Sequence, residues 1–200
     1  MKVLISAVGN TDPIRNFHDG ALVHIARVYR PDKIIVVFSE ELIRKKDDIE
    51  KVIRSIDSQY VPEIVYHEPI ILNNEVHIFD TMFDQFDAII REYYTNDDEF
   101  ILNLSSGTPQ IKSALFVLNR LSEINVKAVQ VPSPEKKSNA GVRHDDSEDI
   151  DVLIDTNMDN KQDYVDRTIE DTSDKFKQGL IKKTLRDFIK KYDYKASLEI

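Results

Sequence analysis

The stretch Val3-Leu4-Ile5-Ser6-Ala7-Val8 runs directly into Gly9-Asn10-Thr11-Asp12. A short, almost wholly apolar run that stops at a glycine is typical of a strand buried on both faces of a sheet. Four more runs of this kind follow, each beyond a longer stretch of helical periodicity: 33–39, 63–67, 100–104 and 126–131. The alternation predicts an α/β fold with a mostly parallel sheet flanked by helices.

The intervening stretches have apolar residues at helical spacing. They predict helices over about 20–30, 40–58, 77–94 and 109–123. The 77–94 stretch is the most amphipathic, and one of its faces carries Phe79, Met82, Phe83, Phe86, Ile89, Ile90 and Tyr93. These helices are long enough to cover both faces of the sheet.

Composition excludes several classes of protein. The 200-residue chain has 27 Lys and Arg against 36 Asp and Glu, a formal charge of −9, so bulk charge cannot attract nucleic acid. The absence of Cys excludes disulfides, thiolate metal sites and cysteine nucleophiles. The five His form no H-E-x-x-H pattern, and we expect no metal site. With no signal peptide and no run near the ~18 apolar residues of a membrane span, a cytoplasmic protein without a membrane partner is expected.

Three regions are expected along the chain: a ligand-sensing core at 1–132, an acidic linker at 133–160 and the start of an α-helical domain at 161–200. The linker begins with turn-forming residues, and residues 145–174 then hold twelve acidic and two basic residues. Ile150–Ile154 is a candidate for an extra strand. From about Asp163 the pattern is helical and reaches Ile200 without a capping signal, so we expect a helical domain cut short.

Two loops at the carboxyl ends of strands carry the candidate site. Ligands of parallel sheets bind where the chain order reverses, which points to the loops after the first and fourth strands. The first loop, 9–20, has a turn glycine, small polar side chains and one Arg. It also fits an ordinary turn in which Asp19 caps the next helix.

The second loop, 105–110, places a helix start at the end of a strand. Thr108 is a good N-cap residue, and Pro109 suits the first helical position. The unpaired N–H groups of that helix end would then face Ser105, Ser106 and the bare backbone of Gly107. Neutral donors at a helix N-terminus can hold phosphate in an acidic protein. A plain capped helix is the alternative.

Together, SAVGNTDPIRNFHDG (residues 6–20) and NLSSGTPQ (residues 103–110) resemble the N-terminal CARF domain of type III-A CRISPR-associated HEPN ribonucleases. The resemblance implies a Rossmann-like fold that forms a homodimer and binds a cyclic oligoadenylate, expected to be cyclic hexa-adenylate, across the two-fold axis. It also implies allosteric activation of a C-terminal ribonuclease for single-stranded RNA in antiviral defence. No cofactor or metal is implied.

The resemblance also assigns roles to residues. Gly9, Asn10, Thr11, Asp12 and Arg15 would contact the ligand's backbone and adenine edges. A second set would cradle phosphates and riboses: Ser105, Ser106, Gly107, Thr108 and Gln110. Slow cleavage of the ring by its own 2′-hydroxyl would use Asn10 and Thr108, with His18 or Asp12 for proton transfer.

One departure limits the activity expected of this chain. The HEPN signature R-x-x-x-x-H occurs nowhere in it, so target RNA would be cut only by a missing domain. Whether the chain is itself an enzyme stays open, with slow ring cleavage as the most it would do. Two alternatives remain: an enzyme that handles the phosphate of a small nucleotide, and a dimerisation module that binds nothing.

Overall fold

The computed structural model describes residues 1–121, 126–133, 149–161, 163–172 and 174–191. The chain divides into two compact units, Met1–Glu170 and Asp171–Ile200, which are described separately. The predicted boundaries at 132 and 160 differ from this division, which falls after Glu170. Most of the turn-forming stretch predicted at the start of the linker lies outside the described residues, since 134–148 are not described.

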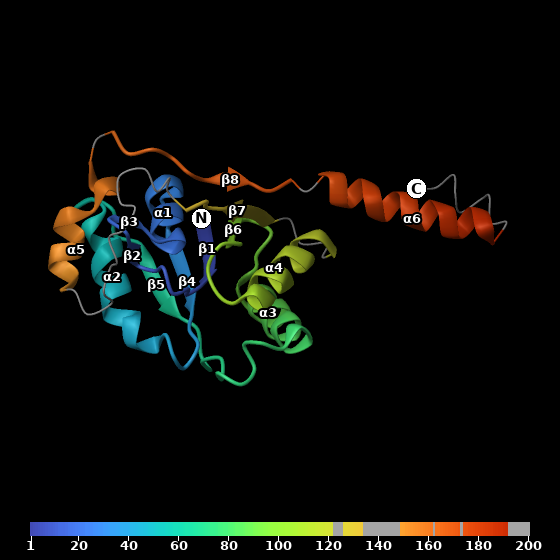
Figure 1. The fold of residues 1–200 in the computed structure, drawn as a ribbon, viewed down its shortest axis with the longest axis horizontal. Coiled ribbons are helices and arrows are strands. Elements are labelled where there is room, and N and C mark those ends of the chain that lie inside the picture. The colour runs from blue at the N-terminus through green and yellow to red at the C-terminus, as the bar shows by residue number, and fades with distance from the viewer. Residues whose placement is uncertain (122–125, 134–148, 162, 173, 192–200) are drawn as a thin grey trace. The chain divides into compact units, whose positions relative to one another are not determined.

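The first unit is built on a six-stranded sheet in the order β5-β4-β1-β6-β7-β8 (Figure 1). Its first five strands in this order are parallel, and β8 is an antiparallel edge strand. The strands are β1 (Lys2–Ala7), β4 (Lys33–Val37), β5 (Glu63–Tyr66), β6 (Glu99–Asn103), β7 (Val126–Gln130) and β8 (Ile169–Glu170). This arrangement confirms the predicted mostly parallel sheet.

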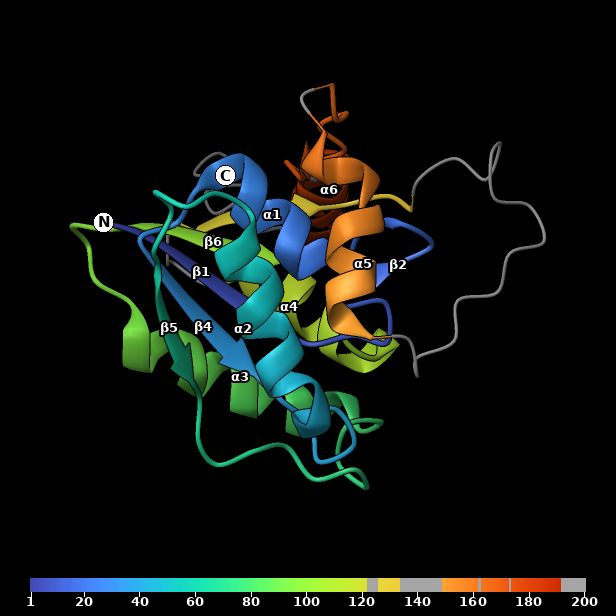
Figure 2. The ribbon, with the colours of Figure 1, turned by 90° about the vertical axis from the view of Figure 1, so that its left-hand side faces the viewer.

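Helices cover both faces of the sheet. One face carries α1 (Ala21–Tyr29), α2 (Lys46–Ser55) and α5 (Ile150–Thr156). The other face carries α3 (Phe79–Tyr93) and α4 (Pro109–Leu121). Figure 2 shows α3 on the side of the sheet opposite α1, α2 and α5. Shorter elements complete the unit: a hairpin of β2 (Ile14–Arg15) and β3 (His18–Asp19), and two 3-10 turns, η1 (Ile43–Lys45) and η2 (Met158–Asn160).

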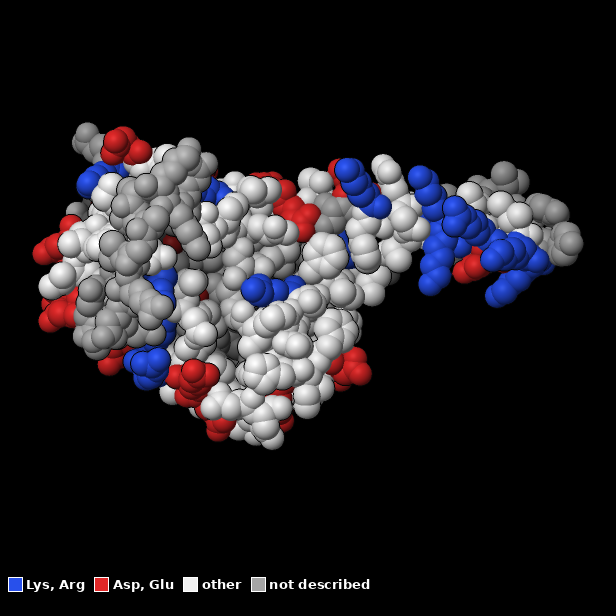
Figure 3. Space-filling model, viewed as in Figure 1, with Lys and Arg blue, Asp and Glu red and all other residues white. Residues whose placement is uncertain are grey.

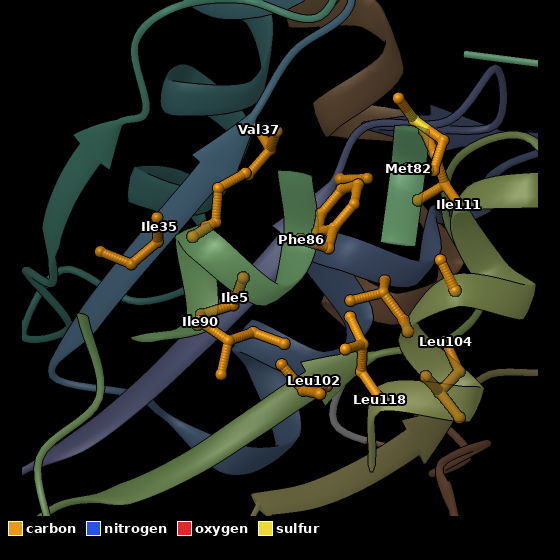
Figure 4. Close-up of a cluster of buried hydrophobic side chains, with 14 of the residues drawn as sticks. Ile5, Ile35, Val37, Met82, Phe86, Ile90, Leu102, Leu104, Ile111 and Leu118 are labelled. Atoms are coloured by element: carbon orange, nitrogen blue, oxygen red, sulfur yellow. The ribbon is translucent and has the colours of Figure 1, made fainter. Parts of the chain in front are cut away.

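Alternate residues of the central strand enter two separate cores. Ile5 of β1 packs with Phe86 of α3 and Leu118 of α4 (Figure 4). Leu4 points to the opposite face and packs with α1 and α2. Both strand residues have no exposed surface, and burying such a side chain stabilises the fold by roughly 1.5–3 kcal/mol. The continuous apolar run of β1 is therefore explained by helices on both sides.

Two predictions for the segment after residue 148 are wrong. Ile150–Ile154 lies in the helix α5, because Ile150, Leu153 and Ile154 all pack on the α1–α2 core at helical spacing. Asp149 caps this helix by accepting the N–H of Asp151. The helix expected from about Asp163 begins only at Asp174, after the edge strand β8.

The second unit contains α6 (Asp174–Lys190). Lys and Arg side chains gather along this helix (Figure 3). Leu180 and Ile181 are exposed on it. Among the described residues, no helix combines the length and the apolar character needed to cross a membrane.

Candidate functional site

The order of strands reverses between β1 and β6. From β1 the chain proceeds outward through β4 to β5, and then returns to β6 on the other side of β1. The chain therefore leaves β1 and β6 in opposite directions along the sheet, and the loops that follow these two strands start side by side at the edge where the parallel strands end. Both predicted loops, 9–20 and 105–110, begin at this point.

Two glycines allow the loops to touch. A Cβ atom added at Gly9 would lie 3.1 Å from the backbone nitrogen of Gly107. Gly107 has φ of 97°, in the left-handed region that favours glycine, and a Cβ there would meet Ile111 at 3.0 Å. A larger residue at Gly9 would press against the second loop, and one at Gly107 would be strained and would press against Ile111.

The N-terminus of α4 opens at the same place. As predicted, Thr108 caps this helix: its Oγ1 accepts the N–H of Ile111 at 3.3 Å. The same hydroxyl donates to the carbonyl of Val76 at 2.6 Å. Within the described residues, the N–H groups of Gly107 and Thr108 have no hydrogen-bond partner. The site thus offers neutral donors at the positive end of a helix dipole.

A cavity of about 320 Å³ lies beside these donors. Four of the predicted site residues line it: Gly9, Asn10, Gly107 and Thr108. Four polar residues that the sequence analysis did not name also line it: Ser39, Glu41, Asn73 and His77. They follow β4 and β5, which end at the same edge of the sheet, so their strand-end positions were the available signal.

Asp12 joins the two loops from beneath. Its carboxylate is buried and accepts the N–H of Gly9 at 2.9 Å, the N–H of Leu22 at 3.1 Å and the hydroxyl of Ser106 at 2.7 Å. Burial raises the pKa of Asp12, partly opposed by these hydrogen bonds. Asp12 does not line the cavity. By accepting from Leu22 in the first turn of α1, it takes the capping role that the turn interpretation gave to Asp19.

A lysine that the sequence analysis missed holds the first loop in place. Lys45, at the end of η1, is 8% exposed. Its Nζ donates to the carbonyl of Asn10 at 2.9 Å and to that of Asp12 at 2.6 Å. Its charge also opposes the rise in the pKa of Asp12. Lys45 therefore fixes the backbone of the loop.

The remaining predicted residues do not line the cavity. Ser105 and Ser106 use their hydroxyls inside the protein: Ser105 accepts the N–H of Val131 at 2.8 Å, and Ser106 accepts from Asn103 at 2.9 Å. The buried Oε1 of Gln110 has no partner among the described residues. Thr11 is exposed and Arg15 lies in β2.

His18 belongs to a second polar cluster. Its Nδ1 lies 3.3 Å from Asp159, in a group that also contains Asp19, His24, Arg27 and Arg167. Donor atoms of Asp19, His24 and Asp159 lie within 4.8 Å of one another, close enough for a metal ion. Arg27 already pairs with Asp19 at 2.6 Å and Arg167 with Asp159 at 2.9 Å. Because these guanidinium groups offset both carboxylates, the donor set fits a cation poorly.

The pKa values in this cluster reflect the charge pairing. Burial alone would raise the pKa of Asp19 and of Asp159, but contacts with His24 and the arginines outweigh it and lower both. Burial would lower the pKa of His24, yet Asp159 and Asp19 raise it. His24 is fully buried.

The sheet order and its two helical layers define a Rossmann-like α/β domain, and a solved structure shares this fold. That structure is Enterococcus italicus Csm6 bound to cyclic hexa-2′-fluoro-hexa-dAMP, with a TM-score of 0.73 and 26% identity, covering 100% of this chain and 48% of that one. Residues 63–168 match the Cas_Csm6 CARF domain. The chain belongs to the Csm6 CARF family, which confirms the resemblance drawn from its two loops.

Curated relatives agree. The chain is 64% identical over 200 residues to the CRISPR system endoribonuclease Csm6′ of Streptococcus thermophilus, covering 52% of that protein. It is 30% identical over 210 residues to Csm6 of Enterococcus italicus, covering 48% of it. The chain thus spans about half the length of the curated relatives it matches.

Proposed function

We propose that this chain is the sensing domain of a CRISPR-associated ribonuclease and binds a cyclic oligoadenylate, namely cyclic hexa-adenylate. The observation that carries the proposal is the meeting of two glycine-bearing loops where α4 presents unpaired N–H groups to a cavity. Such neutral donors hold phosphate without a basic surface. The ring-bound state of the Enterococcus italicus relative supports the same ligand class.

The ligand would be shared by two copies of the chain. A cavity of about 320 Å³ is near the lower end of the range for ligand pockets, so it accommodates only part of a six-nucleotide ring. A symmetric ring suits an isologous dimer, in which the same loops appear twice. Ligand binding would then activate the ribonuclease part that lies outside this chain and cuts single-stranded RNA.

The same site would cleave the ring slowly without a metal. A ribose 2′-oxygen attacks the adjacent phosphorus, the bond to the 5′-oxygen breaks, and the products carry a 2′,3′-cyclic phosphate and a 5′-hydroxyl. Asn10 and the N-terminus of α4 supply donors for the developing charge. Thr108 acts by holding the helix end, since its hydroxyl already donates to Val76. His77 is in the cavity lining and His18 is not, which favours His77 for proton transfer.

The test is a titration of the protein with linear and cyclic oligoadenylates of four and six nucleotides. We expect tight binding that is selective for the six-membered ring. Asn10→Ala should weaken it at least tenfold, while Asn74→Ala, an exposed asparagine outside the cavity lining, should not. Absence of oligoadenylate binding by the unmodified protein would favour the alternative of a dimerisation module that binds nothing. Equal affinity of Asn10→Ala and Asn74→Ala for the ring would refute the proposed site.

Ring cleavage is tested separately. Incubation of the ring with protein and EDTA should yield linear products with 2′,3′-cyclic phosphate ends. Products that form only with added metal would favour the phosphate-handling enzyme instead. Asp12 and His18, which the sequence analysis named for proton transfer, do not line the cavity.

A further inference from the structure

The hairpin β2–β3 forms the second half of the first loop, after residues 9–12. Gly20, just after β3, packs against the first half of the loop so closely that a Cβ atom there would overlap Asp12 and the carbonyl of Thr11. The N–H of Gly20 donates to the carbonyl of Pro13 at 2.8 Å, which closes the base of the hairpin. A displacement of Asp12 must therefore move the hairpin as well.

The far end of this hairpin holds a segment that is distant in sequence. We call residues 157–161 and 163–170 the return segment. Its Met158 N–H donates to the carbonyl of Phe17 at 2.7 Å. Asn157 donates to the Asp19 carboxylate at 2.7 Å, and Asp159 accepts the N–H of Asp19 at 2.8 Å. Three contacts thus join the hairpin to the start of the return segment.

Arg167 ties down the later part of the segment. Its Nη2 donates to the carbonyl of Asp19 at 3.1 Å and to the Asp159 carboxylate at 2.9 Å. Its backbone N–H donates to Nε2 of His24 at 3.0 Å. Asp19 thus contacts the return segment both at its start and at Arg167, while its end is the edge strand β8, paired with β7.

Apolar packing contributes little to this attachment. Val165 is 70% exposed and Ile169 is 53% exposed. A cavity of about 730 Å³ lies along the segment, lined by Met158, Tyr164 and Arg167 among others. An element held by directional polar contacts beside a cavity belongs to the part of a protein that opens locally at low cost. Its attachment therefore depends on the position of Asp19.

We propose that the hairpin couples the ligand loop to the return segment, so that a bound cyclic oligoadenylate makes the segment's attachment firmer. This rests on the proposed function. The ligand would fix residues 9–12 in the conformation seen here, in which Asp12 and Gly20 place Asp19 against its partners. The return segment leads along the chain directly into α6, so this coupling carries the signal of occupancy out of the sensing unit.

Hydrogen exchange of the 200-residue protein tests the coupling. With cyclic hexa-adenylate bound, amides of the return segment should exchange at least fivefold more slowly, a ratio at the lower end of typical coupling between sites. Amides of β5, at the opposite edge of the sheet, should be unchanged. Ligand that binds without slowing exchange in the return segment would overturn the coupling and leave the sensing function intact. Absence of binding would overturn both.

Thermodynamic reciprocity provides the second test. If the ligand stabilises the attachment, weakening the attachment must weaken ligand binding, and complete loss of the attachment must do so by the same factor. Arg167→Met should reduce affinity about tenfold, and Arg167→Lys should recover part of it. Arg167 does not line the ligand cavity. The control Arg54→Met removes an arginine that is 47% exposed and paired on the surface. Equal affinity of Arg167→Met and the wild type would refute the coupling.

Discussion

At the scale of single residues, the Asp12 carboxylate is the hydrogen-bond acceptor that joins the two ligand loops. Asp12→Asn replaces one of its two oxygens by a donor, which would face a group that itself donates: Gly9, Leu22 or Ser106. An unmade buried hydrogen bond costs about 1–3 kcal/mol. We expect urea unfolding to show a loss of that size, and no loss for the exposed Asp84→Asn. Equal stability of the two variants would contradict this arrangement.

His24 makes stability depend on pH. Asp159 and Asp19 raise its pKa above the ordinary value, so its stabilising contribution is complete below about pH 6.5 and is lost as pH rises through the raised value. Asp19 and Asp159 have lowered pKa values and stay ionised over this range. Arg167 and Asp166, which also face His24, do not change that sign.

We therefore expect the free energy of unfolding to fall as the pH rises above about 6.5, by at most about 1.4 kcal/mol per pH unit. His24→Asn should remove this dependence, whereas His77→Asn should keep it. The measurement is urea denaturation at a series of pH values. If the free energy of unfolding changed with pH equally in the wild type and in His24→Asn, His24 would have the same pKa in the folded and unfolded states.

At the scale of elements, the hairpin and α1 meet at Gly20. Gly20→Ala places a Cβ atom against the backbone of Thr11 and Asp12, which cannot yield without moving the ligand loop. We expect thermal denaturation to reveal a loss of about 1–3 kcal/mol, as for other overpacked sites. Gly179→Ala is the matched control: within α6 nothing lies within 4 Å of its Cβ position, and the change should add helix stability instead.

Elements with one unambiguous pattern could be predicted from sequence. β1, β4 and β6 are continuous apolar runs, and the stripe from Phe79 to Tyr93 fits only a helix. The helix α5 could not be predicted, because the run Ile150–Ile154 is too short for the spacing of its apolar residues to distinguish a strand from a helix. The hairpin β2–β3 escaped notice because its two-residue strands carry no alternation.

The candidate site shows the same division. Gly9, Asn10, Gly107 and Thr108 were named because glycine turns and a helix cap leave a local signature. Lys45 has no such local signature in the sequence, because it holds the loop by donating to two carbonyls that are distant from it in sequence. Asp12 and Ser106 were named as ligand contacts, but whether a side chain faces a cavity or another loop is set by tertiary packing. Their assignment to ligand contact stays a prediction.

At the scale of the whole molecule, net charge governs how ligand binding responds to salt. A protein of charge −9 that holds phosphates with neutral donors releases few counterions. We expect affinity for cyclic hexa-adenylate to change by less than about tenfold between ~50 and ~200 mM salt, where six to ten cationic contacts would cost a thousandfold or more. Titrations across that range check this, and a steep fall would indicate cationic contacts.

Assembly can be measured in the same solutions. If two copies share one ring, calorimetry should give one ligand for every two chains, and light scattering should report a dimer of a 23.2 kDa chain in the presence of ligand. One ligand per chain would contradict the shared site. Asn74→Ala, which lies outside the cavity lining, serves as a variant that should leave the ratio unchanged.

The central place of β1 has a consequence for synthesis on the ribosome. Residues 3–5 pair on one side with 33–35, but on the other side only with 100–102. At about 5–20 residues per second, the nascent chain spends several seconds with one flank of this central strand open. Truncated translation products that stop before residue 99 would keep that flank exposed, and we expect them to aggregate or to require chaperones.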